Sequence, residues 1–157
     1  MHVILYRGIA GSGKTYCITK FIKDIPPSKY RIHSADSYRY VEGVYKYDPK
    51  TDTGHMQCFR AFIDDLLHHV AEGWTDFTLI VDNTNTNAWE IAPYMLAATS
   101  FGCTCEVRTV WCDPEIAARR NKHQVPFDVI LKMQRNILMA DLPPFWKHTV
   151  ITNEDDT

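Results

Sequence analysis

Short apolar runs and helical periodicities alternate along the whole sequence. The predicted strands are Val3–Tyr6, Tyr30–Ser34, Phe77–Val81, Thr104–Trp111 and His148–Ile151. The predicted helices cover residues 14–24, 56–72 and 87–100, a segment that begins at Pro114 and a final helix that follows Pro126. The first and third strands are apolar at consecutive positions, which is typical of strands that are buried on both faces of a sheet.

Local signals support the ends of these helices. Asn87, with Glu90 three residues later, predicts a capping box at the start of one helix. Gly73 and Gly102 follow the last apolar positions of two helices, where glycine commonly ends a helix. Pro126 suits the first turn of the final helix, because the first turn needs no backbone N–H from that residue.

This alternation predicts an α/β fold in which a parallel sheet of about five strands has helices on both faces. Ligands of such sheets bind beyond the carboxyl ends of the strands. A chain of 157 residues fits one compact domain, which we expect to cover residues 1–152, followed by an acidic tail over residues 153–157.

Composition narrows the class of protein further. Hydrophobic residues make up 45% of the chain and charged residues 23%, a balance that excludes an intrinsically disordered protein. The apolar runs are too short to span a bilayer and the N-terminus lacks a signal-peptide pattern, so we expect no membrane association and a cytoplasmic location, in the host if a bacteriophage encodes the chain. The odd number of five cysteines argues against a secreted disulfide framework. Cys103 and Cys105 lack the usual zinc spacings and suit ordinary thiols on a strand better than metal ligands.

The segment Gly8–Thr15 has the complete pattern of a phosphate-binding loop, between a predicted strand and a predicted helix. Its glycines allow successive backbone N–H groups to face phosphate oxygens, and the helix adds the positive end of its dipole. The residues expected to bind the nucleotide are Gly8, Gly11, Ser12, Gly13, Lys14 and Thr15. Lys14 supplies charge to the β- and γ-phosphates and Thr15 a hydroxyl ligand for Mg²⁺, so ATP and Mg²⁺ are the expected cofactors. The loop alone does not distinguish a kinase from an ATPase, a GTPase or a nucleotide-gated switch.

Two aspartates follow predicted strands and therefore face the same edge of the sheet. Asp36 is placed to accept a proton from an acceptor hydroxyl, or else to cap the turn formed by residues 34–37. Asp82 ends the most apolar strand, as does the acid that holds Mg²⁺ in many phosphate-loop proteins. Some polar residues that follow Asp82 are expected to shape a tight turn.

Two further segments carry concentrated positive charge. Within Lys29–Lys50 lie five of the eight tyrosines: Tyr30, Tyr38, Tyr40, Tyr45 and Tyr47. They alternate with Lys29, Arg31, Arg39, Lys46 and Lys50. Aromatic faces stack on bases while cations contact phosphates, so this segment suits single-stranded nucleic acid, unless the tyrosines only pack beneath a surface loop. The net charge of −2 does not oppose this interpretation, because Glu154, Asp155 and Asp156 set its sign.

The second basic segment is Arg119–His123, between two predicted helices. Arginines on a mobile lid can neutralise charge on a transferring phosphoryl group. Arg119 and Arg120 are the candidates for this role, and the alternative is an ordinary solvated helix face.

Taken together, these residues resemble the polynucleotide kinase-like branch of the P-loop kinases. This branch includes the kinase half of the bacteriophage polynucleotide kinase/phosphatase and the kinase-like domains of eukaryotic ubiquitin-ligase-binding proteins. The resemblance covers roughly residues 2–140. The matching pieces are Gly8–Thr15, Asp36–Arg39, Val44–Pro49, Ile80–Asn85, and Arg119–Asn121 followed by Val125-Pro126.

The resemblance implies a P-loop fold with a small lid and a role for each matching residue. It implies that Asp36 is the general base for the acceptor hydroxyl, that Arg39 contacts a phosphate of the acceptor strand and that Arg120 clamps the donor phosphates. The further residues expected at the site are Tyr38, Asp82 and Asn85 beside the substrate, and Thr15 with Asp82 at the metal. The lid is shorter here than in the bacteriophage enzyme.

The expected function is transfer of the γ-phosphate of ATP to a hydroxyl on a polynucleotide, with DNA as the expected partner. The acceptor is either a 5′-hydroxyl end or a 5-hydroxymethyl pyrimidine base within DNA, which some bacteriophage relatives phosphorylate. Two alternatives stay open: a kinase for a nucleoside, sugar or antibiotic, and a nucleotide-dependent binding module without turnover.

Overall fold

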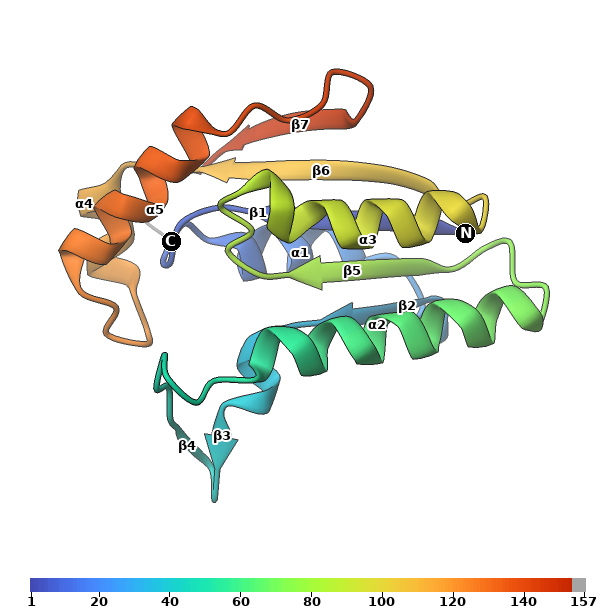
Figure 1. The fold of residues 1–157 in the computed structure, drawn as a ribbon, viewed down its shortest axis with the longest axis horizontal. Helices are drawn as coiled ribbons and strands as arrows, with labels where there is room; N and C mark the ends of the chain where they lie inside the picture. The colour runs from blue at the N-terminus through green and yellow to red at the C-terminus, as the bar shows by residue number, and fades with distance from the viewer. Residues whose placement is uncertain (154–157) are drawn as a thin grey trace.

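The computed structural model describes residues 1–153, which are built around a five-stranded parallel sheet (Figure 1). The strand order is β2-β5-β1-β6-β7, and every neighbouring pair is parallel. The strands are β1 (His2–Arg7), β2 (Tyr30–His33), β5 (Thr78–Asp82), β6 (Thr104–Trp111) and β7 (Lys147–Thr152). The predicted parallel sheet of about five strands is confirmed.

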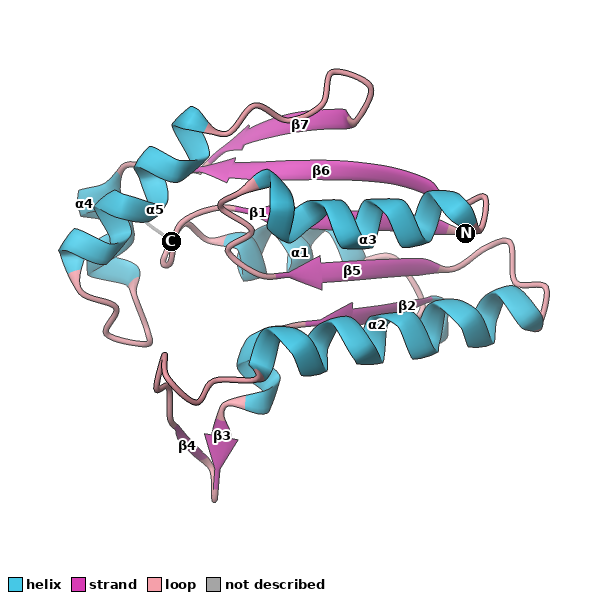
Figure 2. Ribbon diagram, viewed as in Figure 1, coloured by secondary structure: helices cyan, strands magenta, loops and turns pink. Residues whose placement is uncertain are grey.

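Helices cover both faces of this sheet (Figure 2). Strand side chains alternate between the faces, so Val3 and Leu5 of β1 pack with α2 (Gly54–Ala71) and α3 (Ala88–Ser100). On the other face, Ile4 and Tyr6 of the same strand pack against α1 (Lys14–Ile22). Burial on both faces explains why the sequence of β1 shows no alternation of apolar and polar residues.

Two helices, α4 (Pro114–Arg120) and α5 (Phe127–Met139), lie beyond the carboxyl end of β6 (Figure 1). They enclose a separate apolar cluster made of Ile9, Cys112, Ala117, Ile130 and Ile137. Because Ile9 belongs to the phosphate-binding loop, this cluster fixes the helical unit against the loop. We call the segment that joins the two helices, residues 121–126, the lid loop.

The chain between β2 and α2 forms a projection that the sequence pattern did not predict. It contains a 3₁₀ turn, η2 (Ala35–Tyr38), and an antiparallel hairpin of β3 (Tyr40–Val41) and β4 (Val44–Tyr45). A second 3₁₀ turn, η1 (Pro27–Lys29), precedes β2. Glu42 and Gly43 have φ values of 52° and 78°, as a two-residue hairpin turn of the primed type requires. Strands of two residues give no periodicity that a sequence pattern could reveal.

The helix boundaries agree with the sequence prediction to within two residues at most ends. The capping box at α3 is present, and Glu90 accepts a hydrogen bond of 2.8 Å from the backbone N–H of Asn87. Pro93 lies inside α3, which continues through it to Ser100.

Buried Arg7 ties three parts of the chain together at the carboxyl edge of the sheet. Its guanidinium donates to the carbonyl oxygens of Asn85 at 3.0 Å, Thr86 at 2.8 Å and Ile137 at 3.2 Å. These bonds link β1, the segment that follows β5, and α5. Burial lowers the pKa of Arg7, and the carbonyl acceptors replace the water that its charge loses.

Within residues 1–153, no helix has the length and the apolarity that a membrane crossing requires. Residues 154–157 of the predicted tail, which include its acidic residues Glu154, Asp155 and Asp156, lie outside the described residues. The first residue of that predicted tail, Asn153, is instead buried against the phosphate-binding loop, with 7% of its surface exposed.

Candidate active site

The phosphate-binding loop Gly8–Thr15 joins β1 to the N-terminus of α1. The ammonium of Lys14 curls back over the loop and donates to the carbonyl oxygens of Gly8 at 3.0 Å and Ile9 at 3.1 Å. Burial lowers the pKa of Lys14, and the nearby carboxylates of Asp82 and Asp36 partly offset that effect. The loop therefore holds one cation beside the backbone N–H groups that face a phosphate.

Two glycines allow the rest of the protein to approach this loop closely. Gly11 and Gly13 have φ values of 80° and 89°, which side chains rarely adopt. A Cβ atom at Gly11 would lie 2.0 Å from the carbonyl oxygen of Ala117 in α4, and one at Gly13 would lie 2.0 Å from Nδ2 of Asn153. Buried Ser12 Oγ has no hydrogen-bond partner among the described residues, which leaves a hydroxyl available inside the loop.

Asn153 is a site residue that the sequence analysis missed. Its side chain donates to the carbonyl oxygen of Ser12 at 2.9 Å, and its carbonyl oxygen accepts from Arg120 at 3.3 Å. It thus connects the phosphate-binding loop to the lid arginine. The available signal was its position directly after the last strand, at the edge of the sheet where ligands bind.

Thr15 and Asp82 lie together at the mouth of the loop, where the Thr15 hydroxyl donates to Asp82 Oδ2 at 3.0 Å. Burial raises the pKa of Asp82, whereas Lys14 and the Thr15 hydroxyl lower it. Two hard oxygen ligands fit Mg²⁺. No cluster of three or more His, Cys, Asp or Glu side chains within residues 1–153 could hold a metal, so an ion here would need phosphate oxygens as further ligands. This is how Mg²⁺ binds in phosphate-loop proteins.

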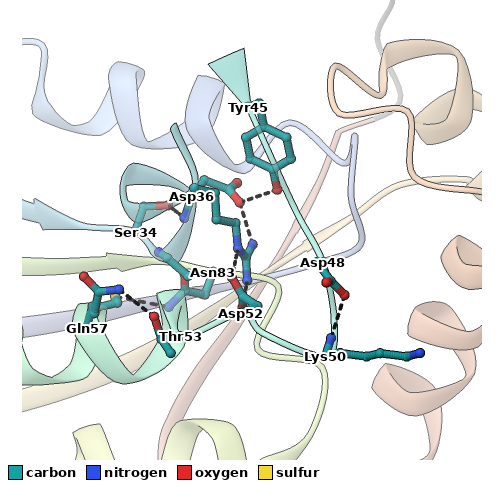
Figure 3. A network of polar contacts seen from close by, with 12 residues as sticks. Ser34, Asp36, Tyr45, Asp48, Lys50, Asp52, Thr53, Gln57 and Asn83 are labelled. Atoms are coloured by element: carbon teal, nitrogen blue, oxygen red, sulfur yellow. Dashed lines mark hydrogen bonds and ion pairs between the residues drawn. The ribbon is translucent and has the colours of Figure 1, made fainter. Parts of the chain in front are cut away.

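Asp36 lies in η2 with its carboxylate turned toward the hairpin (Figure 3). The turn is capped by Ser34, whose hydroxyl accepts from the Asp36 backbone N–H at 3.3 Å. The Asp36 carboxylate instead accepts side-chain bonds at Oδ1, from Arg39 Nη1 at 2.7 Å and from the Tyr45 hydroxyl at 3.0 Å. The other oxygen, Oδ2, accepts neither of these bonds. Burial and the Asp36 carboxylate raise the pKa of Tyr45 to about 12, so its hydroxyl keeps its proton.

Arg39 is held on three sides. Besides Asp36, its guanidinium binds both carboxylate oxygens of Asp52 and lies 4.7 Å from the ring centre of Tyr47. Burial opposes its charge, but the hydrogen bonds to Asp52 and Asp36 outweigh burial and raise its pKa. Arg39, which is predicted to bind an acceptor phosphate, organises the projection through these contacts.

Asn83 and Asn85, in the segment that follows β5, have structural roles. Asn83 Oδ1 accepts from the backbone N–H of Ala35 at 2.8 Å, which joins the segments after β5 and β2. Asn85 was expected beside the substrate, but only 1% of its surface is exposed and its amide donates to the Tyr6 carbonyl at 2.8 Å. Burial and this bond give Asn85 a part in shaping the loop that follows β5.

The other predicted residues are divided between the two sides of the site. Tyr38, 40% exposed, lies in η2 beside Asp36. Arg119 and Arg120 are both in the last turn of α4, where Arg119 is exposed and Arg120 is half-buried with bonds to Asn153 and to Cys112 Sγ at 3.9 Å.

The lid loop reaches across to the hairpin, a contact that the sequence analysis did not predict. Asn121 folds the loop by donating to the Val125 carbonyl at 2.7 Å and accepting from the His123 backbone N–H at 3.2 Å. The His123 ring stacks on Tyr45 with ring centres 3.9 Å apart and planes inclined by 22°. His123 Nε2 lies 3.6 Å from Asp36 Oδ2.

A lysine in a phosphate-binding loop, a hydroxyl and a carboxylate for Mg²⁺, and a second carboxylate facing the same mouth define the site of a P-loop kinase domain. Residues 3–136 of the chain match the family model described as "AAA domain". The chain belongs to this family.

A human protein and a chain of a solved complex are also similar to this chain. Human NEDD4-binding protein 2 is 30% identical over 140 residues, which are 83% of this chain and 7% of that much longer protein. The Pnkp1/Rnl/Hen1 RNA repair complex contains a chain with a TM-score of 0.66 and 15% identity, matched over 88% of this chain and 45% of its own length.

Small-molecule kinases share the fold as well. A sugar kinase from Janibacter sp. HTCC2649 has a TM-score of 0.58 and 16% identity over 97% of this chain and 85% of its own. A gluconokinase from Sinorhizobium meliloti 1021 has a TM-score of 0.59 and 14% identity, matched over 96% of this chain and 82% of its own. At these identities the likeness shows the fold alone.

Proposed function

We propose that this chain is a cytoplasmic ATP- and Mg²⁺-dependent kinase that phosphorylates a hydroxyl on a polynucleotide. The observation that carries the proposal is the Asp36 carboxylate. Its Oδ1 is held by Arg39 and Tyr45, which leaves Oδ2, with His123 Nε2 at 3.6 Å, as the oxygen for a reacting hydroxyl. Its charge also influences both Lys14 and Asp82 across the site. An enzyme that only positioned water would not need a carboxylate held in this way.

Each side chain then has a defined part in the transfer. Asp36 Oδ2 takes the proton of the acceptor hydroxyl while the hydroxyl oxygen forms a bond to the γ-phosphorus. The bond between the γ-phosphorus and the oxygen that bridges it to the β-phosphate breaks, and ADP leaves. Lys14 and the loop N–H groups bind the β- and γ-phosphates, and Arg120, with Arg119 beside it, approaches from α4. Thr15 and Asp82 would hold Mg²⁺, which neutralises charge on the phosphates.

The surface next to Asp36 supports a polynucleotide as the acceptor. The hairpin and its flanks expose Tyr38, Tyr40 and Tyr47, at 40%, 52% and 54%. Exposed Lys46 and Lys50 lie between and beyond them. This combination of stacking surfaces and cations suits a nucleic-acid strand and has no purpose for a small neutral sugar. DNA is the proposed acceptor. RNA is tested beside it, because one structural neighbour belongs to an RNA repair complex.

The acceptor is tested by mapping transferred label. Labelled ATP and Mg²⁺ are supplied with a 5′-hydroxyl oligonucleotide, as DNA and as RNA, and with a 5′-phosphorylated duplex that carries internal hydroxymethyluracil. Label at the terminus supports phosphorylation of ends, and label on internal bases supports base modification. The proposal is overturned if none of these acceptors is labelled and the unmodified protein transfers no more label than Asp36→Asn. That result favours a binding module without turnover.

A small-molecule kinase is the second candidate, favoured by the near-complete coverage of the sugar kinase and gluconokinase structures. The salt dependence of activity separates the two. A polynucleotide acceptor makes KM rise steeply with salt, and Lys46→Gln reduces that slope by about one unit of log KM against log salt. An acceptor without phosphates gives a KM that neither salt nor Lys46→Gln changes.

A further inference from the structure

The lid loop and the hairpin meet through stacked rings beside the proposed general base. His123 lies on Tyr45 at 3.9 Å with an inclination of 22°, and its Nε2 is 3.6 Å from Asp36 Oδ2. These separations are those of one planar ring stacked on another. A single ring thus covers the Tyr45 face and approaches the carboxylate oxygen that a substrate hydroxyl needs.

The Tyr45 ring is fixed in a way that suits a stacking platform. Its hydroxyl donates to Asp36 Oδ1 at 3.0 Å, and Tyr40 contacts it at an inclination of 72° with ring centres 5.5 Å apart. Tyr45 is half-buried, whereas Tyr40 and Tyr47 are exposed. Because both its edge and its hydroxyl are held, the ring presents a fixed face beside Asp36.

His123 is also presented by a built loop. Asn121 bonds the backbone on both sides of it, at the His123 N–H and at the Val125 carbonyl. Gln124, the next residue, has a φ of 53°, a left-handed conformation that turns the chain immediately after the histidine. The packing of this loop directs the imidazole toward the hairpin.

We infer that the Tyr45 face is an acceptor subsite for a planar heteroaromatic ring, a nucleobase, and that His123 fills this subsite until the acceptor displaces it. The inference rests on the proposed function, because a nucleobase is the ring that a polynucleotide brings. The same occupancy protects the site before the acceptor binds. The Asp36 side chain is 41% exposed, and His123 Nε2 occupies one approach to its Oδ2, at 3.6 Å. A water molecule on that approach would give its proton to the carboxylate, attack the γ-phosphorus and release ADP and phosphate, and His123 takes its place.

Hydrolysis of ATP without any acceptor tests the occupancy. His123→Ala opens Asp36 Oδ2 to water, and we expect a several-fold higher rate of ADP release. His123→Phe keeps a ring on Tyr45 and stays near the rate of the unmodified protein. The matched control is Gln124→Asn, an exposed lid substitution that tolerates the left-handed backbone and leaves the rate unchanged. An unchanged rate in His123→Ala, or an equal rise in His123→Phe, overturns the inference.

The acceptor subsite is tested with two substitutions of Tyr45. Tyr45→Phe and Tyr45→Leu both remove the hydroxyl bond to Asp36, but only Tyr45→Leu removes the ring. For the polynucleotide that the unmodified protein labels, we expect the KM of Tyr45→Leu to exceed that of Tyr45→Phe at least about fivefold, while the KM for ATP is equal in both. Equal acceptor KM values overturn the subsite. Failure of the unmodified protein to label any polynucleotide overturns the proposed function instead, and the hydrolysis rates still decide whether His123 covers Asp36.

Discussion

Arg39 and Asp52 form a two-point ion pair, with Nε 2.9 Å from Oδ1 and Nη2 2.8 Å from Oδ2. Their side chains are 11% and 14% exposed, so water screens the pair less than it screens a surface pair. The remaining Nη1 binds Asp36, which makes Arg39 the link between the start of α2 and the proposed base. The irregular projection between β2 and α2 is therefore held, through Arg39, at the carboxylate of Asp36.

Replacement of Asp52 by asparagine is expected to destabilise the protein by about 1–3 kcal/mol at neutral pH, because a charged, two-point acceptor is lost. The hydrogen bonds from Arg39 lower the pKa of Asp52. A lowered pKa stabilises the folded state above the ordinary aspartate pKa of about 4, and this contribution is lost as the pH falls through the folded value. Urea unfolding of both proteins should therefore show a difference in the free energy of unfolding that is complete at pH 7 and becomes smaller below about pH 4. A difference that does not change with pH would show that the charge of Asp52 contributes nothing.

Asp36→Asn is expected to retain ATP binding and to lose about two to four orders of magnitude in phosphoryl transfer. The amide oxygen can still accept from Arg39 and Tyr45, so the geometry is kept while the proton acceptor is removed. Equilibrium binding of ATP, compared with the rate of label transfer, separates the two effects. Turnover equal to that of the unmodified protein would exclude Asp36 as the base.

Thr15→Val is expected to raise the Mg²⁺ concentration at half-maximal activity by about tenfold. It removes the hydroxyl that bonds Asp82 at 3.0 Å and that would ligate the ion, a loss of the order of one hydrogen bond to a charged group. Activity is titrated with Mg²⁺ at saturating ATP. Thr19→Val, one turn further along α1, is the matched control, since that hydroxyl donates only to the Thr15 carbonyl. The same Mg²⁺ midpoint in all three proteins would remove Thr15 from the metal site.

The sheet and the phosphate-binding loop could be predicted from the sequence because local patterns encode them. Val3–Tyr6 shows burial on both faces, and Gly8–Thr15 has fixed spacings that follow from the backbone geometry of the loop. Asp36 and Asp82 could be placed at one edge because both follow parallel strands.

The contacts that complete the site could not be predicted in this way. Tyr45 and His123 are 78 positions apart on two irregular segments, and only the packed fold shows that their rings stack. Asn85 belongs to the motif that follows the strand, but the sequence does not reveal that its amide turns inward to the Tyr6 carbonyl. Such side-chain directions depend on tertiary packing and carry no periodic signal.

Gly13 and Asn153 are expected to be energetically coupled, and a double-mutant cycle measures the coupling. Gly13→Ala places a methyl group 2.0 Å from Asn153 Nδ2 and forces alanine into a φ of 89°, so it should cost several kcal/mol of stability and most of the affinity for ATP. Asn153→Ala loses the bond to the Ser12 carbonyl, which costs about 1 kcal/mol. In the double variant the clash is gone while the backbone strain stays.

Unfolding free energies and ATP affinities of the four proteins should therefore be non-additive. Gly13→Ala should be milder in the Asn153→Ala background than in the unmodified protein, with an interaction energy of about 1–2 kcal/mol. Additive costs would show that Asn153 moves aside freely when Gly13 is substituted, and would contradict its role as a fixed support of the phosphate-binding loop. A positive interaction would instead show that a residue directly after the last strand, beyond the phosphate motif itself, sets the shape of the nucleotide site.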